Sequence, residues 1–77
     1  MNISLEYYKV FYNVAKLGSI SAAANSLFIS QPAVSQSLRA LEKNLGVTLL
    51  ERASRGMKLT GEGQLLYSYV KSGYEQI

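Results

Sequence analysis

The sequence predicts a mainly α-helical domain, in which three helices and a β-hairpin are followed by a further helix. Apolar residues recur at intervals of three and four over residues 4–17, 21–28, 31–44 and 61–77, which is the spacing of one face of a helix. Over residues 47–60 apolar and polar residues instead alternate around a turn, which predicts a hairpin. A chain of 77 residues has room for one small core.

The first helix is expected over residues 4–17, with Ser4 as its N-cap and Gly18 at its end. Two tyrosines of this helix, Tyr7 and Tyr12, lie off its apolar face and would cover either the edge of the core or a neighbouring subunit. The apolar face itself should consist of Leu5, Tyr8, Phe11, Val14 and Ala15.

A short second helix is expected over residues 21–28, where Ser21 is the candidate N-cap. Three consecutive alanines favour the helix and let a neighbouring helix approach closely. Leu27 and Phe28 are the expected apolar anchors at its end.

The third helix, over residues 31–44, carries signals at both ends. Ser30 is a good N-cap, Pro32 suits the first turn, and Gly46 can end the helix in the left-handed conformation. An ordinary amphipathic surface helix has the same pattern, so the pattern alone does not make this a binding helix. Its apolar stripe is formed by Val34, Leu38, Leu41 and Leu45.

The element in front of the third helix favours a binding role. Two helices joined by a very short turn form a helix-turn-helix, a motif whose second helix enters the major groove of DNA. The third helix presents amide and hydroxyl groups near its N-terminus, and such groups read base edges, while Arg and Lys neutralise phosphates. A hairpin after this motif is a wing, so the predicted fold is a winged helix-turn-helix.

The predicted wing consists of an apolar strand at residues 47–50, a turn at residues 53–56 and a returning strand at residues 57–60. Cationic side chains on a wing can lie along phosphates or enter a narrow minor groove. Without the helix-turn-helix they would be interpreted as solvated hairpin charges. The cations concerned are Arg52, Arg55 and Lys58.

A last helix is expected over residues 61–77, starting at a Thr60 cap. Gly63 and Gly73 weaken this helix but permit close approach of a neighbour. Its apolar stripe could fold back on the first helix or could pair with the same helix of a second chain. This stripe consists of Leu66, Val70, Tyr74 and Ile77.

Composition narrows the classes of function. The net charge is +3, and five of the eight Lys and Arg residues lie between residues 39 and 58, which suits an anionic partner. The chain has no Cys and no His, which excludes disulfides, the usual zinc sites and His-based general bases. No apolar run approaches the length of a membrane span, so a cytoplasmic protein is the expectation.

The segment SISAAANSLFISQPAVSQSLRALEKNLGVTLLER, from Ser19 to Arg52, closely resembles the N-terminal DNA-binding domain of LysR-type transcriptional regulators. The resemblance extends upstream into the first helix and downstream through the wing, so it covers almost the whole chain. Two departures concern the core and the site: Leu50 stands where the family commonly has Phe, and Gln36 stands where many members carry Arg.

The resemblance implies a DNA-binding domain at residues 1–60 and a linker helix at residues 61–77 through which two chains dimerise. The helix at residues 31–44 would enter the major groove, and residues 52–58 would lie on the backbone or in the minor groove. Family members continue into a larger domain that binds a small effector, which this segment would precede, and full-length members form dimers or tetramers.

The expected DNA contacts fall into two groups. Phosphate contacts are assigned to Ser21, Arg39, Arg52 and Arg55. Base reading is assigned to Gln31, Pro32, Ser35 and Gln36, since Gln bonds adenine, Ser accepts several bases and Pro covers a thymine methyl. Ser30 serves as a cap and as a contact. Glu42 is expected to be solvated or ion-paired, because phosphate repels an acid.

The leading hypothesis is therefore a dimer that reads a dyad-symmetric double-stranded operator. A protein-interaction module with the same core is the alternative, but it would not require cations around the third helix and the wing. An enzyme is not supported, because no catalytic constellation or phosphate-binding glycine loop can be placed.

Overall fold

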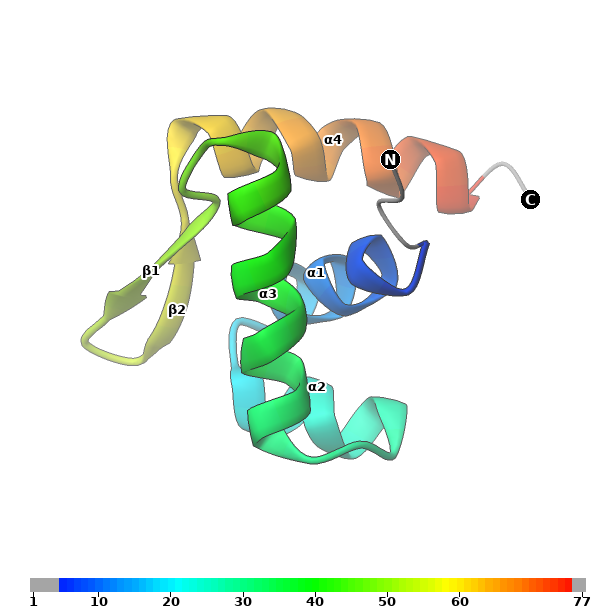
Figure 1. Cartoon of the computed structure of the whole chain (residues 1–77), viewed down its shortest axis with the longest axis vertical. Coiled ribbons are helices and arrows are strands. Elements are labelled where there is room, and N and C mark those ends of the chain that lie inside the picture. The colour runs from blue at the N-terminus through cyan, green and yellow to red at the C-terminus, as the bar shows by residue number, and fades with distance from the viewer. Residues whose placement is uncertain (1–4, 76–77) are drawn as a thin grey trace.

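The structure, a computed structural model, describes residues 5–75 and forms a winged helix-turn-helix there (Figure 1). The predicted fold class is confirmed, whereas the predicted cap Ser4 and the last stripe residue Ile77 lie outside the described residues. The elements of this part of the chain are α1 (Leu5–Leu17), α2 (Ile20–Leu27), α3 (Gln31–Leu45), β1 (Leu50–Ala53), β2 (Gly56–Leu59) and α4 (Gly61–Glu75).

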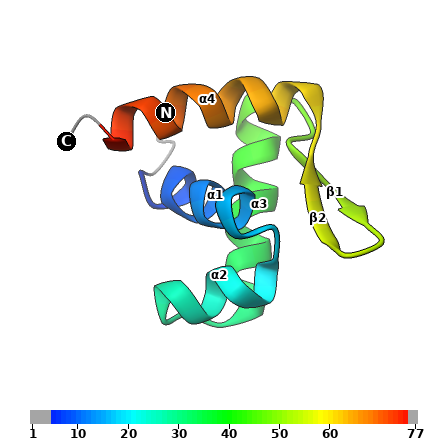
Figure 2. The same cartoon turned by 180° about the vertical axis from the view of Figure 1, so that it is seen from behind.

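Figures 1 and 2 show how these elements are arranged around α3. Helix α2 lies at the N-terminal end of α3, α1 packs against its middle, and α4 runs across the top of both views, near the point where α3 ends. The β1–β2 hairpin projects to one side of the helices as the wing. The N-terminal end of α3 and the wing therefore border the same side of the molecule.

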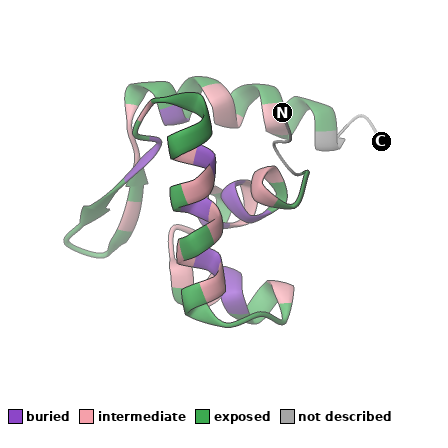
Figure 3. Ribbon diagram, viewed as in Figure 1, coloured by how far each residue is buried: buried purple, intermediate pink, exposed green. Residues whose placement is uncertain are grey.

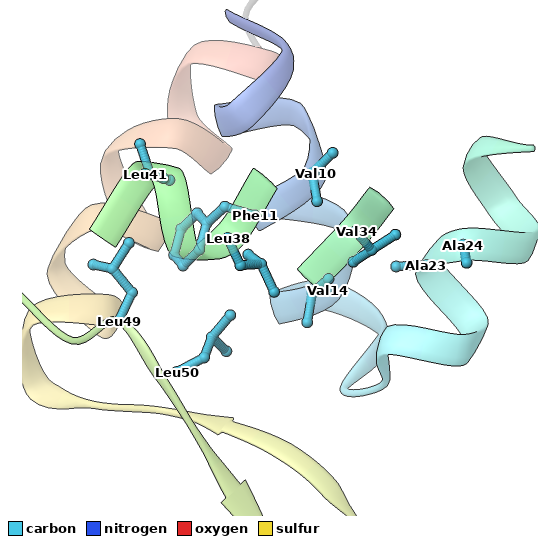
Figure 4. Packing of buried hydrophobic residues seen from close by; sticks show 10 residues of the cluster. All are labelled: Val10, Phe11, Val14, Ala23, Ala24, Val34, Leu38, Leu41, Leu49 and Leu50. Atoms are coloured by element: carbon cyan, nitrogen blue, oxygen red, sulfur yellow. The ribbon is translucent and has the colours of Figure 1, made fainter. Parts of the chain in front are cut away.

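The core lies between α1, α2 and α3 and is closed by the segment that enters the wing (Figure 4). On α1 the buried side chains are Val10, Phe11 and Val14, so the face turned to the core is rotated relative to the predicted one. Leu5, which was predicted to lie on that face, is 84% exposed. The remaining buried apolar residues are Ala23, Ala24, Val34, Leu38, Leu41, Leu49 and Leu50.

Helix α2 begins one residue earlier than predicted. Its N-cap is Ser19, whose extended backbone lets the Oγ atom accept a hydrogen bond from the backbone N–H of Ala22 at 3.0 Å. Ser21 is therefore an exposed residue of the first turn and not the cap. At the other end, Phe28 adopts the left-handed conformation with φ 60° and is 94% exposed, so its prediction as an apolar anchor is wrong.

Helix α3 starts at the predicted residue and has the predicted caps, but it ends at Leu45, one residue later than predicted. The Ser30 Oγ atom accepts from the N–H of Ala33 at 3.2 Å, and Gly46 closes the helix with φ 72°. The apolar stripe is buried only as far as Leu41, because Leu45 lies at the last turn and is 37% exposed.

The wing is a two-stranded antiparallel sheet in which Leu50 pairs with Leu59 and Ala53 pairs with Gly56. It is fixed to the turn between α1 and α2, where the N–H of Met57 donates to the carbonyl oxygen of Gly18 at 3.0 Å. A Cβ atom at Gly56 would collide with that same carbonyl oxygen, and Gly56 has φ 89°, so only glycine suits this position.

Helix α4 folds back on the rest of the chain. Thr60 caps it as predicted: its Oγ1 atom accepts from the N–H of Gly63 at 3.0 Å and donates to the carbonyl oxygen of Thr48 at 2.6 Å. Close approach is confirmed at Gly63, where a Cβ atom would collide with the carbonyl oxygen of Leu49, but not at Gly73, where a Cβ atom meets nothing within 4 Å.

An aromatic contact joins α4 to α1. The rings of Tyr12 and Tyr67 stack at 5.7 Å between centroids, with 25° between their planes. Leu66 also packs against the core cluster. Of the two predicted possibilities for Tyr12, contact within the chain is the one that the structure shows.

Candidate nucleic-acid interface

A concavity opens between the first turn of α2, the first turns of α3 and the wing. We call it the α3–wing groove. Its mouth brings together five of the predicted contact residues from three separate parts of the chain. The residues that line the mouth are Ser19, Ile20, Ser21, Gln31, Pro32, Ser35, Arg52, Gly56 and Met57.

The groove continues along α3 toward the root of the wing, by which we mean Leu49 and Leu50, where the chain enters β1. Ser35 and Arg52 line both parts, and Arg39 lines only this inner part. Leu38 and Glu42 border it further along α3, and Leu50 closes it from the wing. One wall of the groove is thus a side of α3, and the opposite wall is the face of the wing that carries Arg52.

The outward face of α3 carries the side chains that were assigned to base reading. Gln31, Pro32 and Gln36 are exposed, and Ser35 is half-buried. Figure 3 shows exposed, half-buried and buried residues alternating along α3. Gln31 and Ser35 border the groove, whereas Gln36 is not among its lining residues. Since the apolar stripe of α3 points into the core, these neutral hydrogen-bonding groups can meet a ligand.

Ser30 combines two properties of the predicted site. Its hydroxyl oxygen is the acceptor of the α3 cap, at 3.2 Å from the Ala33 nitrogen. The hydroxyl hydrogen remains available as a donor, because a serine hydroxyl accepts and donates independently. Ser30 is also exposed, so the cap and an outward contact are compatible.

The cations of the wing divide between its faces. Arg52 pairs across the sheet with Met57, and both side chains border the groove. Lys58 pairs with Glu51, on the alternate face of the two strands. Arg55 lies in the turn at the tip and is exposed. Arg52 is therefore the wing cation that faces α3.

Glu42 has a role that the sequence did not indicate. Its carboxylate oxygen Oε2 accepts hydrogen bonds from the backbone N–H groups of Leu49 at 2.8 Å and Leu50 at 3.2 Å. The expectation of a solvated or ion-paired side chain is therefore wrong. No local pattern could reveal it, because the partners lie seven and eight residues further along the chain.

The predicted dimerisation stripe is partly used inside the chain. Leu66 and Val70 are half-buried, and Leu66 packs against the core. The large apolar side chains that α4 leaves exposed are Leu65, at 61%, and Tyr69, at 70%. The side chain of Tyr74 is not among those that the structure describes.

Residues 5–75 contain neither a metal-binding cluster nor a membrane-spanning helix. That part of the chain contains no group of three or more His, Cys, Asp or Glu side chains that could hold a metal ion. None of its helices has the length and apolarity that a membrane crossing requires.

Comparison with known proteins gives a consistent result. The family model described as "Bacterial regulatory helix-turn-helix protein, lysR family" matches residues 5–64. The HTH-type transcriptional regulator y4mQ of Sinorhizobium fredii is 40% identical over 74 residues, which cover 96% of this chain and 25% of that protein. The regulator TcbR of Pseudomonas sp. is 49% identical over 55 residues, or 71% of this chain and 19% of that protein. The chain thus spans a quarter or less of these relatives.

Solved structures are similar over nearly the whole chain. A crystal structure of the CbnR DNA-binding domain with DNA matches with a TM-score of 0.85 at 38% identity, covering 99% of this chain and 85% of that one. The BenM DNA-binding domain with benA site 1 DNA matches with a TM-score of 0.86 at 36% identity, covering 99% and 86%. At these identities the likeness extends beyond the fold to the family.

Proposed function

Because this chain belongs to the LysR family of bacterial regulatory helix-turn-helix proteins, we propose that it binds double-stranded DNA sequence-specifically and serves transcription regulation. The observation that carries this proposal is the α3–wing groove, where the polar N-terminal face of α3 and the cation Arg52 border one concavity. The CbnR and BenM domains, which have similar structures, were crystallised in complex with DNA. Such a role belongs in the cytoplasm, at the bacterial nucleoid, and needs no catalytic residue.

Affinity and specificity come from different side chains in this proposal. Arg39, Arg52 and Arg55 neutralise phosphates, and Ser21 donates a hydroxyl hydrogen bond at the start of α2. These contacts position the protein without reading sequence. Helix α3 enters the major groove, which is wide enough to admit a helix.

Sequence is read by the outward face of α3. The amides of Gln31 and Gln36 offer a donor and an acceptor together, which matches the edge of adenine. Ser35 bonds either base type, Pro32 covers a thymine methyl group, and Ser30 donates at the helix start.

We further propose that residues 1–60 form the DNA-binding unit and that residues 61–77 join two copies. A symmetric pair of chains would present two α3 helices to two half-sites of a dyad-symmetric operator. The exposed side chains Leu65 and Tyr69 support a partner on α4. The half-buried Leu66 and Val70 would border that contact from the inner side of the helix.

A selection experiment tests this function. The 77-residue chain is mixed with a randomised pool of DNA duplexes at near-physiological salt, and the bound duplexes are sequenced. Enrichment of a dyad-symmetric motif is expected. A variant with Gln31→Ala and Gln36→Ala serves as the control and should enrich a less defined motif. Binding that disappears with rising salt and enriches no sequence would contradict specific recognition.

A further inference from the structure

Glu42 connects α3 to the root of the wing through one atom. Its Oε2 accepts from the N–H groups of Leu49 and Leu50, at 2.8 Å and 3.2 Å, just where the chain leaves the core and β1 begins. The side chains of Leu49 and Leu50 are 1% and 7% exposed, so this point of the backbone is anchored in the core. A single carboxylate oxygen on α3 therefore binds the backbone at the start of β1.

The other backbone contacts of the wing hold it to different partners. The N–H of Met57 bonds to the carbonyl oxygen of Gly18, and the N–H of Thr60 bonds to the carbonyl oxygen of Leu49, both at 3.0 Å. The first contact fixes the wing to the turn before α2, and the second fixes its two ends to each other. The carboxylate of Glu42 is the acceptor that joins the start of β1 directly to α3.

The position of Glu42 in the groove gives this contact a consequence for DNA. Glu42 and Arg39 both line the inner part of the α3–wing groove, and Arg52 faces them from the wing. The distance between α3 and Arg52 depends on where β1 starts. The carboxylate is turned to the root of β1, away from the mouth formed by Gln31 and Pro32.

We propose that Glu42 is a positioning residue for DNA binding, which holds the wing so that Arg52 reaches a phosphate while α3 occupies the major groove. This inference rests on the proposed function. It also explains why an acid is tolerated beside the proposed DNA surface, where phosphates repel it. The repulsion is outweighed because the carboxylate organises a cation that would otherwise miss its phosphate.

Positioning and electrostatics predict different results for two neutral replacements. If only the charge mattered, Glu42→Gln and Glu42→Ala would both bind DNA more tightly than the parent chain. If Glu42 positions the wing, Glu42→Gln keeps an acceptor oxygen for both N–H groups and binds at least as tightly as the parent. Glu42→Ala removes the acceptor and should bind the selected operator at least threefold more weakly.

The decisive measurement is a double-mutant cycle with Arg52→Ala, read as the slope of log affinity against log salt. In the parent chain Arg52→Ala should reduce the slope by about one unit, as expected for one lost phosphate contact. In the Glu42→Ala background the same change should have no effect on the slope, because Arg52 no longer reaches its phosphate. In the Glu42→Gln background the effect of Arg52→Ala should return.

Glu51→Ala is the matched control, because it removes an exposed acid from the same hairpin without touching the root of β1. It should leave the Arg52 effect at its full size. If Glu42→Ala does not fold, as circular dichroism would show, Glu42→Asp takes its place, because its shorter side chain cannot reach the start of β1.

The outcomes separate the two proposals. A full Arg52 effect in the Glu42→Ala chain would show that Glu42 supports stability alone and would overturn the positioning role while leaving DNA binding intact. A parent chain that binds no operator sequence would instead overturn the proposed function, and the positioning role would fall with it.

Discussion

Phe28 holds a backbone conformation that costs free energy without an evident gain in burial. Its φ of 60° and ψ of 39° are left-handed, and among the described non-glycine residues it is the one with positive φ. This conformation closes α2, because the Phe28 N–H bonds back to the carbonyl oxygens of Ala24 and Asn25. Helix ends of this kind favour Gly or Asn.

We therefore expect Phe28→Asn to raise the free energy of unfolding by about 0.5–1 kcal/mol, since Asn tolerates the left-handed region and little apolar burial is lost. Chemical denaturation followed by circular dichroism measures this change. Phe28→Ala is the control, because it removes the ring but keeps the backbone cost. Equal stabilities of the Asn and Ala variants would show that the conformation of Phe28 carries no such cost.

Gln36 tests base reading at a single residue. It is exposed on the outward face of α3, away from the core. Gln36→Ala should weaken binding to the selected site by about 1–3 kcal/mol and relax the preference at one base position. Binding to a panel of singly substituted duplexes measures both effects. Asn44→Ala, an exposed change near the far end of α3, is the control, and equal weakening on every duplex would assign Gln36 to a different role.

Two individual residues, Ser19 and Glu42, have roles that could not be predicted from the sequence. Ser19 and Ser21 are equally good caps by residue type. Ser19 is the N-cap because the backbone is extended there, directly after the turn at Gly18. The prediction for Glu42 was wrong for another reason. Its partners are backbone groups of a distant segment, so no residue pattern indicates them.

At the scale of elements, α3 was predicted almost to the residue because its limits are local. Ser30, Pro32 and Gly46 decide the start and the end without help from the rest of the chain. The existence of the hairpin was equally predictable from its alternation, although β1 starts at Leu50 and not at residue 47. The docking of the wing was not predictable, because it depends on the approach of Gly56 to Gly18.

Helix α4 offers a matched pair of glycines that separates helix propensity from packing. Gly63 is buried against the carbonyl oxygen of Leu49, whereas Gly73 faces open space. Propensity alone predicts that Ala at either position stabilises the helix by up to about 1 kcal/mol.

We expect Gly63→Ala to lower the free energy of unfolding by about 1–3 kcal/mol, because the added Cβ atom forces α4 away from the wing root. Gly73→Ala should leave stability unchanged or slightly raised. Urea unfolding of the two variants measures the difference. Stabilisation by Gly63→Ala would mean that α4 does not approach Leu49 as closely as the structure shows.

At the scale of the whole molecule, one core serves all the elements, and α4 contributes to it while keeping another face outside. The sequence showed that α4 has an apolar stripe but could not decide which residues the chain itself would cover. Leu65 and Leu66 are neighbours in sequence and lie on different faces: Leu66 packs against the core and Leu65 is exposed. Tyr67, the neighbour of Leu66, stacks on Tyr12 of α1 and also packs against the core, so this face of α4 is the one turned to the rest of the chain.

Because Leu66 and Leu65 lie on different faces of α4, we expect substitution of Leu66 to lower stability and substitution of Leu65 to disrupt assembly. Leu66→Ala should lower the free energy of unfolding by roughly 1–2 kcal/mol, less than for a fully buried leucine, because its side chain is only half-buried. Leu65→Asp combined with Tyr69→Asp should leave the fold of each chain intact. The double change should separate the two copies of the proposed dimer, because the new negative charges would repel each other where the two α4 helices meet. Sedimentation equilibrium measures the assembly state, and denaturation measures the fold.

The DNA affinity of the doubly substituted chain links this assembly to operator binding. Two linked α3 helices bind a dyad-symmetric duplex more tightly than either does alone, since the second contact becomes intramolecular. The Leu65→Asp, Tyr69→Asp chain should therefore lose at least about tenfold in affinity for the full dyad and little for an isolated half-site. If Leu66→Ala separated the copies instead, the contact would lie on the inner face of α4, and α4 would have to leave the core for two chains to meet.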